Sequence, residues 1–113
     1  MDAREKMKQR LAAKKEIREF FSSKRKALGA GSIFDFSIEN SVKRKLLGGM
    51  NSIGRDAEIK AMALVDRGDA WEPALDEAKQ KLEKLKQDIL KGLMQGDAAG
   101  KPYEKIAELI RSL

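Results

Sequence analysis

The sequence contains no cysteine and no histidine. Their absence excludes disulfide bonds, thiolate and imidazole metal sites, and every catalytic pair that needs a Cys or a His. Aromatic residues make up only 5% of the chain, and the Asp, Glu and Lys residues show no spacing that brings a catalytic pair together. We therefore expect a protein that is not an enzyme and that uses no metal and no cofactor.

Long apolar runs are absent as well. No stretch approaches the roughly 18 apolar residues of a membrane span, and the polar opening MDAREKMKQR holds no apolar signal core. These two absences predict a cytoplasmic protein that does not bind membranes. The lack of cysteine fits a reducing compartment.

Charge is abundant, and it is unevenly distributed. Of the 113 residues 37% are charged, and the net charge is +6. Residues 1–50 carry 13 basic and 6 acidic residues, whereas residues 51–113 carry 11 and 12. This asymmetry indicates that the N-terminal part faces an acidic partner while the remainder serves packing.

The apolar spacing predicts an all-α fold, a small bundle of about four helices in one domain covering residues 1–113. A basic N-terminal helix is expected over 1–28, with Asp2 as its N-cap and Gly29 at its end. Residues 41–113 are expected to build the rest of the bundle. Their helices run from a cap at Asn40 or Ser41 to about 65, from about 73 to 95, and from about 102 to the end.

The second of these segments contains three interior glycines, at 48, 49 and 54. Each interior glycine costs a helix up to about 1 kcal/mol relative to alanine. The sequence leaves open whether this helix continues through Gly48-Gly49 or breaks there. Gly49–Asp56 also matches the G-x4-G frame of a phosphate-binding loop, but Arg55 and Asp56 stand where Lys and Ser/Thr are needed. A glycine-kinked helix is the better interpretation.

An extended connector is expected over 29–40. Within it, Ser32–Glu39 (SIFDFSIE) alternates apolar and polar residues, as a strand does. A lone strand cannot satisfy its own backbone hydrogen bonds. We therefore favour a connector whose Phe side chains enter the core, and the alternative is a strand that pairs with another chain.

The clearest periodicity is a seam of apolar residues at alternating spacings of four and three. It comprises Trp71, Leu75, Ala78, Leu82, Leu85 and Ile89. A seam of about three heptads suits a bundle or a helical hairpin within one chain, or a homodimer through 71–89.

Six basic residues of the first helix fall on one side at 100° per residue, in a row about 33 Å long from Arg4 to Lys26. That length is close to the axial repeat of duplex nucleic acid, about 34 Å. No base-reading motif accompanies the row, so we expect contact with the nucleic-acid backbone that tolerates any sequence. The expected contact residues are Arg4, Lys8, Lys15, Arg18, Arg25, Lys26, Lys43, Arg44 and Lys45.

The same sequence supports a second hypothesis from another class. A small helical chain without catalytic groups also suits an adaptor or inhibitor subunit that grips a larger protein through amphipathic helices. In that case Phe20 and Phe21 are the expected partner-binding anchors.

Overall fold

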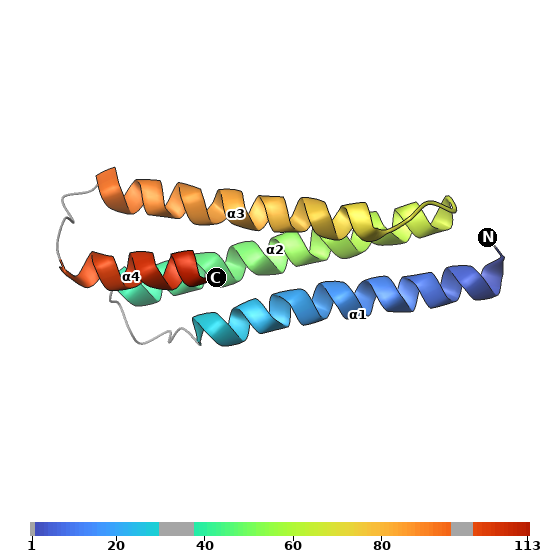
Figure 1. Cartoon of the computed structure of the whole chain (residues 1–113), viewed down its shortest axis with the longest axis horizontal. Helices are drawn as coiled ribbons and strands as arrows, with labels where there is room; N and C mark the ends of the chain where they lie inside the picture. The colour runs from blue at the N-terminus through green and yellow to red at the C-terminus, as the bar shows by residue number, and fades with distance from the viewer. Residues whose placement is uncertain (1, 30–37, 96–100) are drawn as a thin grey trace.

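The computed structural model describes residues 2–29, 38–95 and 101–113. It contains four helices, α1 (Ala3–Leu28), α2 (Ile38–Asp66), α3 (Glu72–Gln95) and α4 (Lys101–Ser112). No strand occurs in these three ranges. The predicted all-α class and the number of helices are confirmed (Figure 1).

The ends of α1 follow the expected chemistry. The Asp2 carboxylate accepts a hydrogen bond from the Glu5 backbone N–H at 2.7 Å, so one of the unpaired amides of the first turn is satisfied. At the other end Gly29 has φ +82°, a conformation that glycine adopts readily, and its N–H donates to the Arg25 carbonyl. The helix begins and ends where the sequence predicts.

The second helix is continuous from Ile38 to Asp66, which settles the question at Gly48-Gly49. It also begins earlier than expected. Ile38 and Glu39 are helical, and Asn40 is a buried residue inside the first turn rather than an N-cap. The glutamate in this turn favours the earlier start, because a negative charge stabilises a helix N-terminus. The expected connector is therefore shorter at its end, and its residues 30–37 lie outside the described ranges.

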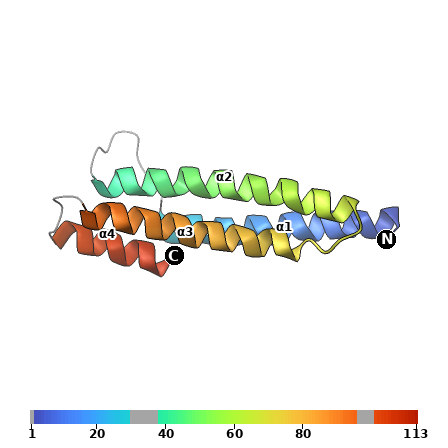
Figure 2. The same ribbon diagram turned by 90° about the horizontal axis from the view of Figure 1, so that it is seen from above.

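The central helix of the fold is α2, which packs along α1 on one flank and along α3 on the other. Two of its glycines mark the closest approaches. Gly54 lies against the Phe21 ring of α1, and Gly49 lies against the Leu85 side chain of α3. The short α4 packs on α3 over one end of the bundle, on the face opposite α2 (Figures 1 and 2). The resulting body is elongated, 57 × 26 × 18 Å.

The predicted seam of α3 faces the interior of this single chain. Five of its six residues are buried and Leu85 is half-buried. The Trp71 indole N–H donates to the Gln9 side chain of α1 at 3.0 Å, so the polar atom at the end of the seam is also satisfied. The seam is thus buried within one chain, chiefly against α2, and a homodimer through 71–89 stays a prediction.

None of the described helices is long and apolar enough to cross a membrane.

Candidate polyanion-binding surface

Four of the predicted contact residues lie along the outer side of α1. Arg4, Lys8, Lys15 and Lys26 are all exposed. At 100° per residue they fall within about 40° of one another, on the side opposite the buried Ile17. No ion pair or hydrogen bond engages their charged groups within the described parts of the chain. We call these four residues the outer α1 row.

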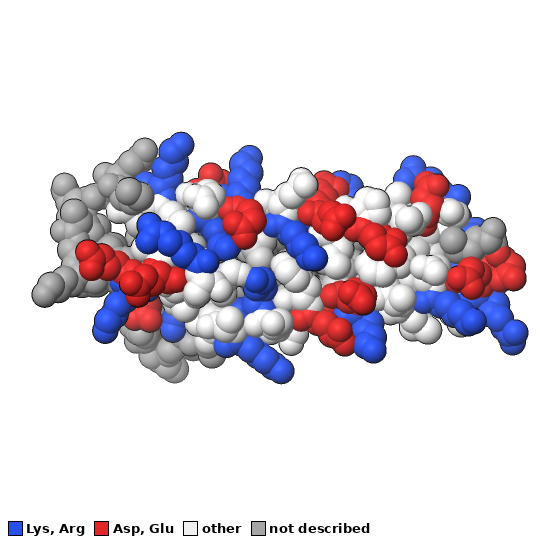
Figure 3. Space-filling view, in the orientation of Figure 1, with Lys and Arg blue, Asp and Glu red and all other residues white. Residues whose placement is uncertain are grey.

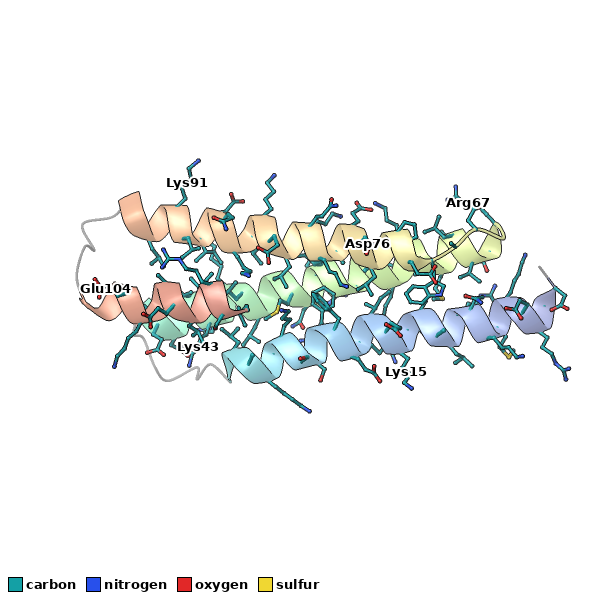
Figure 4. All side chains as sticks on the ribbon, in the orientation of Figure 1. Lys15, Lys43, Arg67, Asp76, Lys91 and Glu104 are labelled. Carbon is teal, nitrogen blue, oxygen red and sulfur yellow. The ribbon has the colours of Figure 1, made fainter. Side chains whose placement is uncertain are left out.

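The outer α1 row is straight, because its residues belong to one unbroken 26-residue helix. From Arg4 to Lys26 it extends about 33 Å. Lys15 points away from the bundle, whereas Lys91 points outward from α3 on the opposite side (Figure 4). The buried residues Ala13, Ile17 and Phe21 fix this orientation, since they hold the other side of α1 against the core.

Two further predicted residues, Arg18 and Arg25, have partners on α2. Arg18 Nε donates to Glu58 Oε1 at 2.8 Å, and Arg25 Nε donates to Asn51 Oδ1 at 3.1 Å. The Arg18 side chain remains 68% exposed. An exposed ion pair contributes at most about 1 kcal/mol, so a stronger anion can compete for Arg18. Both arginines face α2 rather than the outer row.

The basic triplet at the start of α2 does not form one patch. The Lys43 side chain is largely buried beside Gly29, and its Nζ lies 3.5 Å from Glu39 Oε1. Arg44 and Lys45 are exposed and have no ion pair among the described residues. Successive residues on a helix point about 100° apart. The triplet is therefore divided between the interior and two different outer directions.

The predicted partner anchors are not available as expected. Phe21 is 1% exposed and belongs to the protein's own core. Phe20 is half-buried and stands edge-on to Phe21, with ring centroids 5.0 Å apart. The ammonium groups of Lys24 and Lys79 each lie 5.4 Å from the Phe20 ring centre. Both rings thus pack α1 into the bundle, because Phe21 faces Gly54 of α2 and Phe20 faces Lys79 of α3.

Sequence reasoning missed the exposed apolar side chains. Met7 and Leu11 on α1 and Ile59 on α2 are 61%, 64% and 64% exposed. A signal was available for Leu11, which lies about 80° from Phe21 around the helix axis, but Met7 lies only about 40° from Phe21. The predicted contact residues also did not include Lys14 of α1 and Arg55 of α2, whose side chains are exposed near these apolar residues.

Other candidate chemistry finds little support in the described residues. No group of three or more Asp or Glu side chains there could hold a metal ion. The G-x4-G segment Gly49–Asp56 is helical, so its amides are committed to helix hydrogen bonds and cannot cradle a phosphate. Beside the α2–α3 turn, a hydrogen bond from Lys60 lowers the pKa of Glu77, and Lys81 acts in the same direction.

Charge of both signs is interspersed on the face that carries α4 (Figure 3). On the outer side of α1 cations predominate, but the exposed Glu19 lies within about 60° of all four residues of the outer α1 row around the helix axis. Comparison with known protein families, curated proteins and solved structures finds no match. A functional proposal therefore rests on the surfaces described above.

Proposed function

We propose that this protein is a non-enzymatic accessory protein whose outer α1 row contacts the backbone of nucleic acid, alone or within a nucleic-acid-containing assembly. The observation that carries the proposal is the row itself. Four cations lie on one side of a straight helix, and their charged groups have no partner among the described residues. Phosphates along a nucleic acid are the polyanion that such a row suits.

The contact is expected to tolerate any base sequence. The row consists of three lysines and one arginine, and among the side chains that the structure describes no aromatic ring is exposed beside it. These residues therefore support neither base-edge recognition nor base stacking. Arg44 and Lys45 beyond the end of α1 would add contacts, and Arg18 would exchange Glu58 for a phosphate. Affinity would then come mainly from the release of counterions.

The test is binding of a fluorescent 20-base-pair duplex, and of one strand alone, to the full chain at low salt. Lys8→Glu with Lys15→Glu should weaken binding about tenfold or more, because two attractive contacts become repulsive. The matched control is Lys84→Glu with Lys91→Glu. These two lysines are also exposed and seven residues apart, and the reversal changes the net charge equally, but they lie on α3.

Equal loss with both double variants would mean that only net charge matters and would refute a site on α1. No binding of either oligonucleotide by the unmodified chain would refute the function.

Binding of a protein partner is the second candidate function. The Phe20 and Phe21 anchors expected for it are buried or packed, but the exposed Met7, Leu11 and Ile59 favour it. Large apolar side chains at this exposure are typical of contact surfaces when they lie together.

A further inference from the structure

The exposed apolar side chains lie along one edge of the molecule, where α1 meets α2. Three side-chain contacts define this edge and run antiparallel. Arg10 pairs with Asp66, Arg18 with Glu58, and Arg25 with Asn51. Met7 and Leu11 stand eleven and seven residues before Arg18, which is close to whole turns of the helix. They therefore occupy the same flank of α1 as Arg18.

Ile59 follows Glu58 on α2, so it lies level with the Arg18 pair. The antiparallel register places Leu11 about 9 Å from Ile59 along the bundle axis and Met7 about 15 Å from it. Met62, one turn from Ile59, is half-buried. We call Met7, Leu11 and Ile59 the α1–α2 edge. Its length corresponds to about three turns of a helix laid beside it.

Neither α3 nor α4 covers this edge. On α1, Gln9 and Phe20 face α3, and they lie about half a turn away from Arg18. On α2, Lys60 binds Glu77 of α3 and lies on the flank opposite Glu58. Figure 2 shows α2 along one side of the molecule and α4 along the other. The α1–α2 edge therefore faces solvent.

The charges around the edge select its partner. Arg4, Lys14 and Arg55 flank it and have no ion pair among the described residues. Glu58 and Asp66, the acids on the α1 side of the edge, are already bound to Arg18 and Arg10. The exposed Asp56 lies on the other side of Ile59, toward α3. A partner therefore meets apolar side chains bordered by uncompensated positive charge, which complements carboxylates.

We infer that the α1–α2 edge docks an acidic amphipathic helix of a partner protein. The apolar side of that helix would cover Met7, Leu11 and Ile59, and its flanking Asp or Glu side chains would meet Arg4, Lys14 and Arg55. Amphipathic helices dock on partners through apolar residues at i, i+3 or i+4, and i+7. A second copy of this chain does not suit the edge, because the cations around the edge of one copy would repel those of the other. Nucleic acid does not suit the edge either, because aliphatic side chains cannot stack on bases as aromatic rings do.

This inference deepens the second candidate function and rests on it. The α1–α2 edge lies beside the outer α1 row, and Arg4 borders both surfaces. The test uses the full chain and a labelled 18-residue helical peptide with Leu at i, i+4, i+7 and i+11, flanked by Glu. Fluorescence anisotropy measures its binding. We expect saturable binding that Leu11→Ser with Ile59→Ser weakens about tenfold or more, because each serine removes an apolar contact. The conservative variant, Leu11→Met with Ile59→Met, should bind the peptide about as tightly as the unmodified chain.

Charge reversal provides the second comparison. Arg55→Glu should weaken peptide binding several-fold, whereas Lys84→Glu on α3 should leave it unchanged. The serine variant should bind oligonucleotides as the unmodified chain does, and thermal unfolding should confirm that it folds, since both side chains are exposed.

Three results would overturn the inference and separate it from the functions proposed above. Peptide binding that the serine variant leaves intact would preserve a protein-binding role but move it elsewhere. Absence of peptide binding would remove both the edge and the second candidate function, while oligonucleotide binding would stand independently. Tighter binding to vesicles of anionic lipid than to the peptide, lost with the same serines, would assign the edge to a membrane surface instead.

Discussion

Individual glycines of α2 occupy different environments although the sequence presents them as similar interruptions. A Cβ atom added at Gly48 would meet no atom within 4 Å. One added at Gly54 would lie 3.2 Å from Cδ2 of Phe21, which is fixed in the core. The first glycine therefore costs helix stability without a packing gain, whereas the second permits the close approach of α1.

Alanine substitution should separate these two cases. We expect Gly48→Ala to raise the free energy of unfolding by about 0.5–1 kcal/mol, because alanine favours the helix and loses less backbone entropy on folding. Gly54→Ala should lower it by about 1 kcal/mol, since overpacking against Phe21 outweighs the gain in propensity. Urea unfolding followed by circular dichroism measures both. Equal stabilisation by the two changes would show that Phe21 yields without cost.

A second test at the residue scale concerns the ion pair between α2 and α3. The hydrogen bond from Lys60 lowers the pKa of Glu77 below its ordinary value of 4.5. A lowered pKa in the folded state stabilises the fold above the unfolded pKa, and this contribution is lost as the pH falls from about 4.5 through the folded value. Lys60→Met should move the pKa of Glu77 back toward 4.5 in an NMR titration of its carboxyl group. Lys84→Met should leave it unchanged.

For single residues, the sequence predicted features that depend on close neighbours in the chain, but not features that depend on contacts with other helices. Asp2 and Gly29 were predictable as caps, because capping depends on a few neighbouring residues. The continuity of α2 was not predictable, because contacts with Phe21 and Leu85 on other helices offset the cost of its glycines. Burial of Phe21 likewise depends on Gly54, 33 residues along the chain.

At the scale of elements, α4 shows how a short helix is held. It is 12 residues long, and Ile106, Ile110 and Leu113 at its apolar side are buried. A helix of this length is marginal in water by itself, so its stability comes from that buried side. The periodicity of these residues was visible in the sequence, but the helix they pack against was not, since periodicity identifies a face and not its neighbour.

Truncation of one α4 side chain should therefore be costly, whereas the same change on the α1–α2 edge should not. Ile110 is 0% exposed, so Ile110→Ala should lower the free energy of unfolding by about 2–4 kcal/mol. Ile59→Ala should change it by less than about 0.5 kcal/mol, because Ile59 is already in water. Thermal unfolding of the two variants measures the difference. A similar cost at both positions would mean that Ile59 is covered in the folded protein.

Across the whole molecule, the helices divide the charged residues into those that join elements and those that face outward. Arg10, Arg18 and Lys60 form ion pairs between helices. The cations of the outer α1 row form none with the residues that the structure describes. The sequence predicted that six cations share one side of α1, and it could not predict which of them α2 would engage, because Glu58 and Asn51 are distant in the chain. It also did not reveal the α1–α2 edge, which exists only where two helices meet.

The central claim is that the outer α1 row meets phosphates directly, and the salt dependence of duplex binding tests it. Each engaged phosphate contributes about −0.9 to the slope of log K against log[salt]. The four cations of the outer α1 row contribute about −3.6 to the slope of the unmodified chain, and any contacts from Arg18, Arg44 and Lys45 make it steeper. Lys8→Glu with Lys15→Glu should make the slope shallower by about 1.8. The Lys84→Glu and Lys91→Glu variant should keep the full slope. Equal slopes for all three proteins, or a slope near zero for the unmodified chain, would contradict the account.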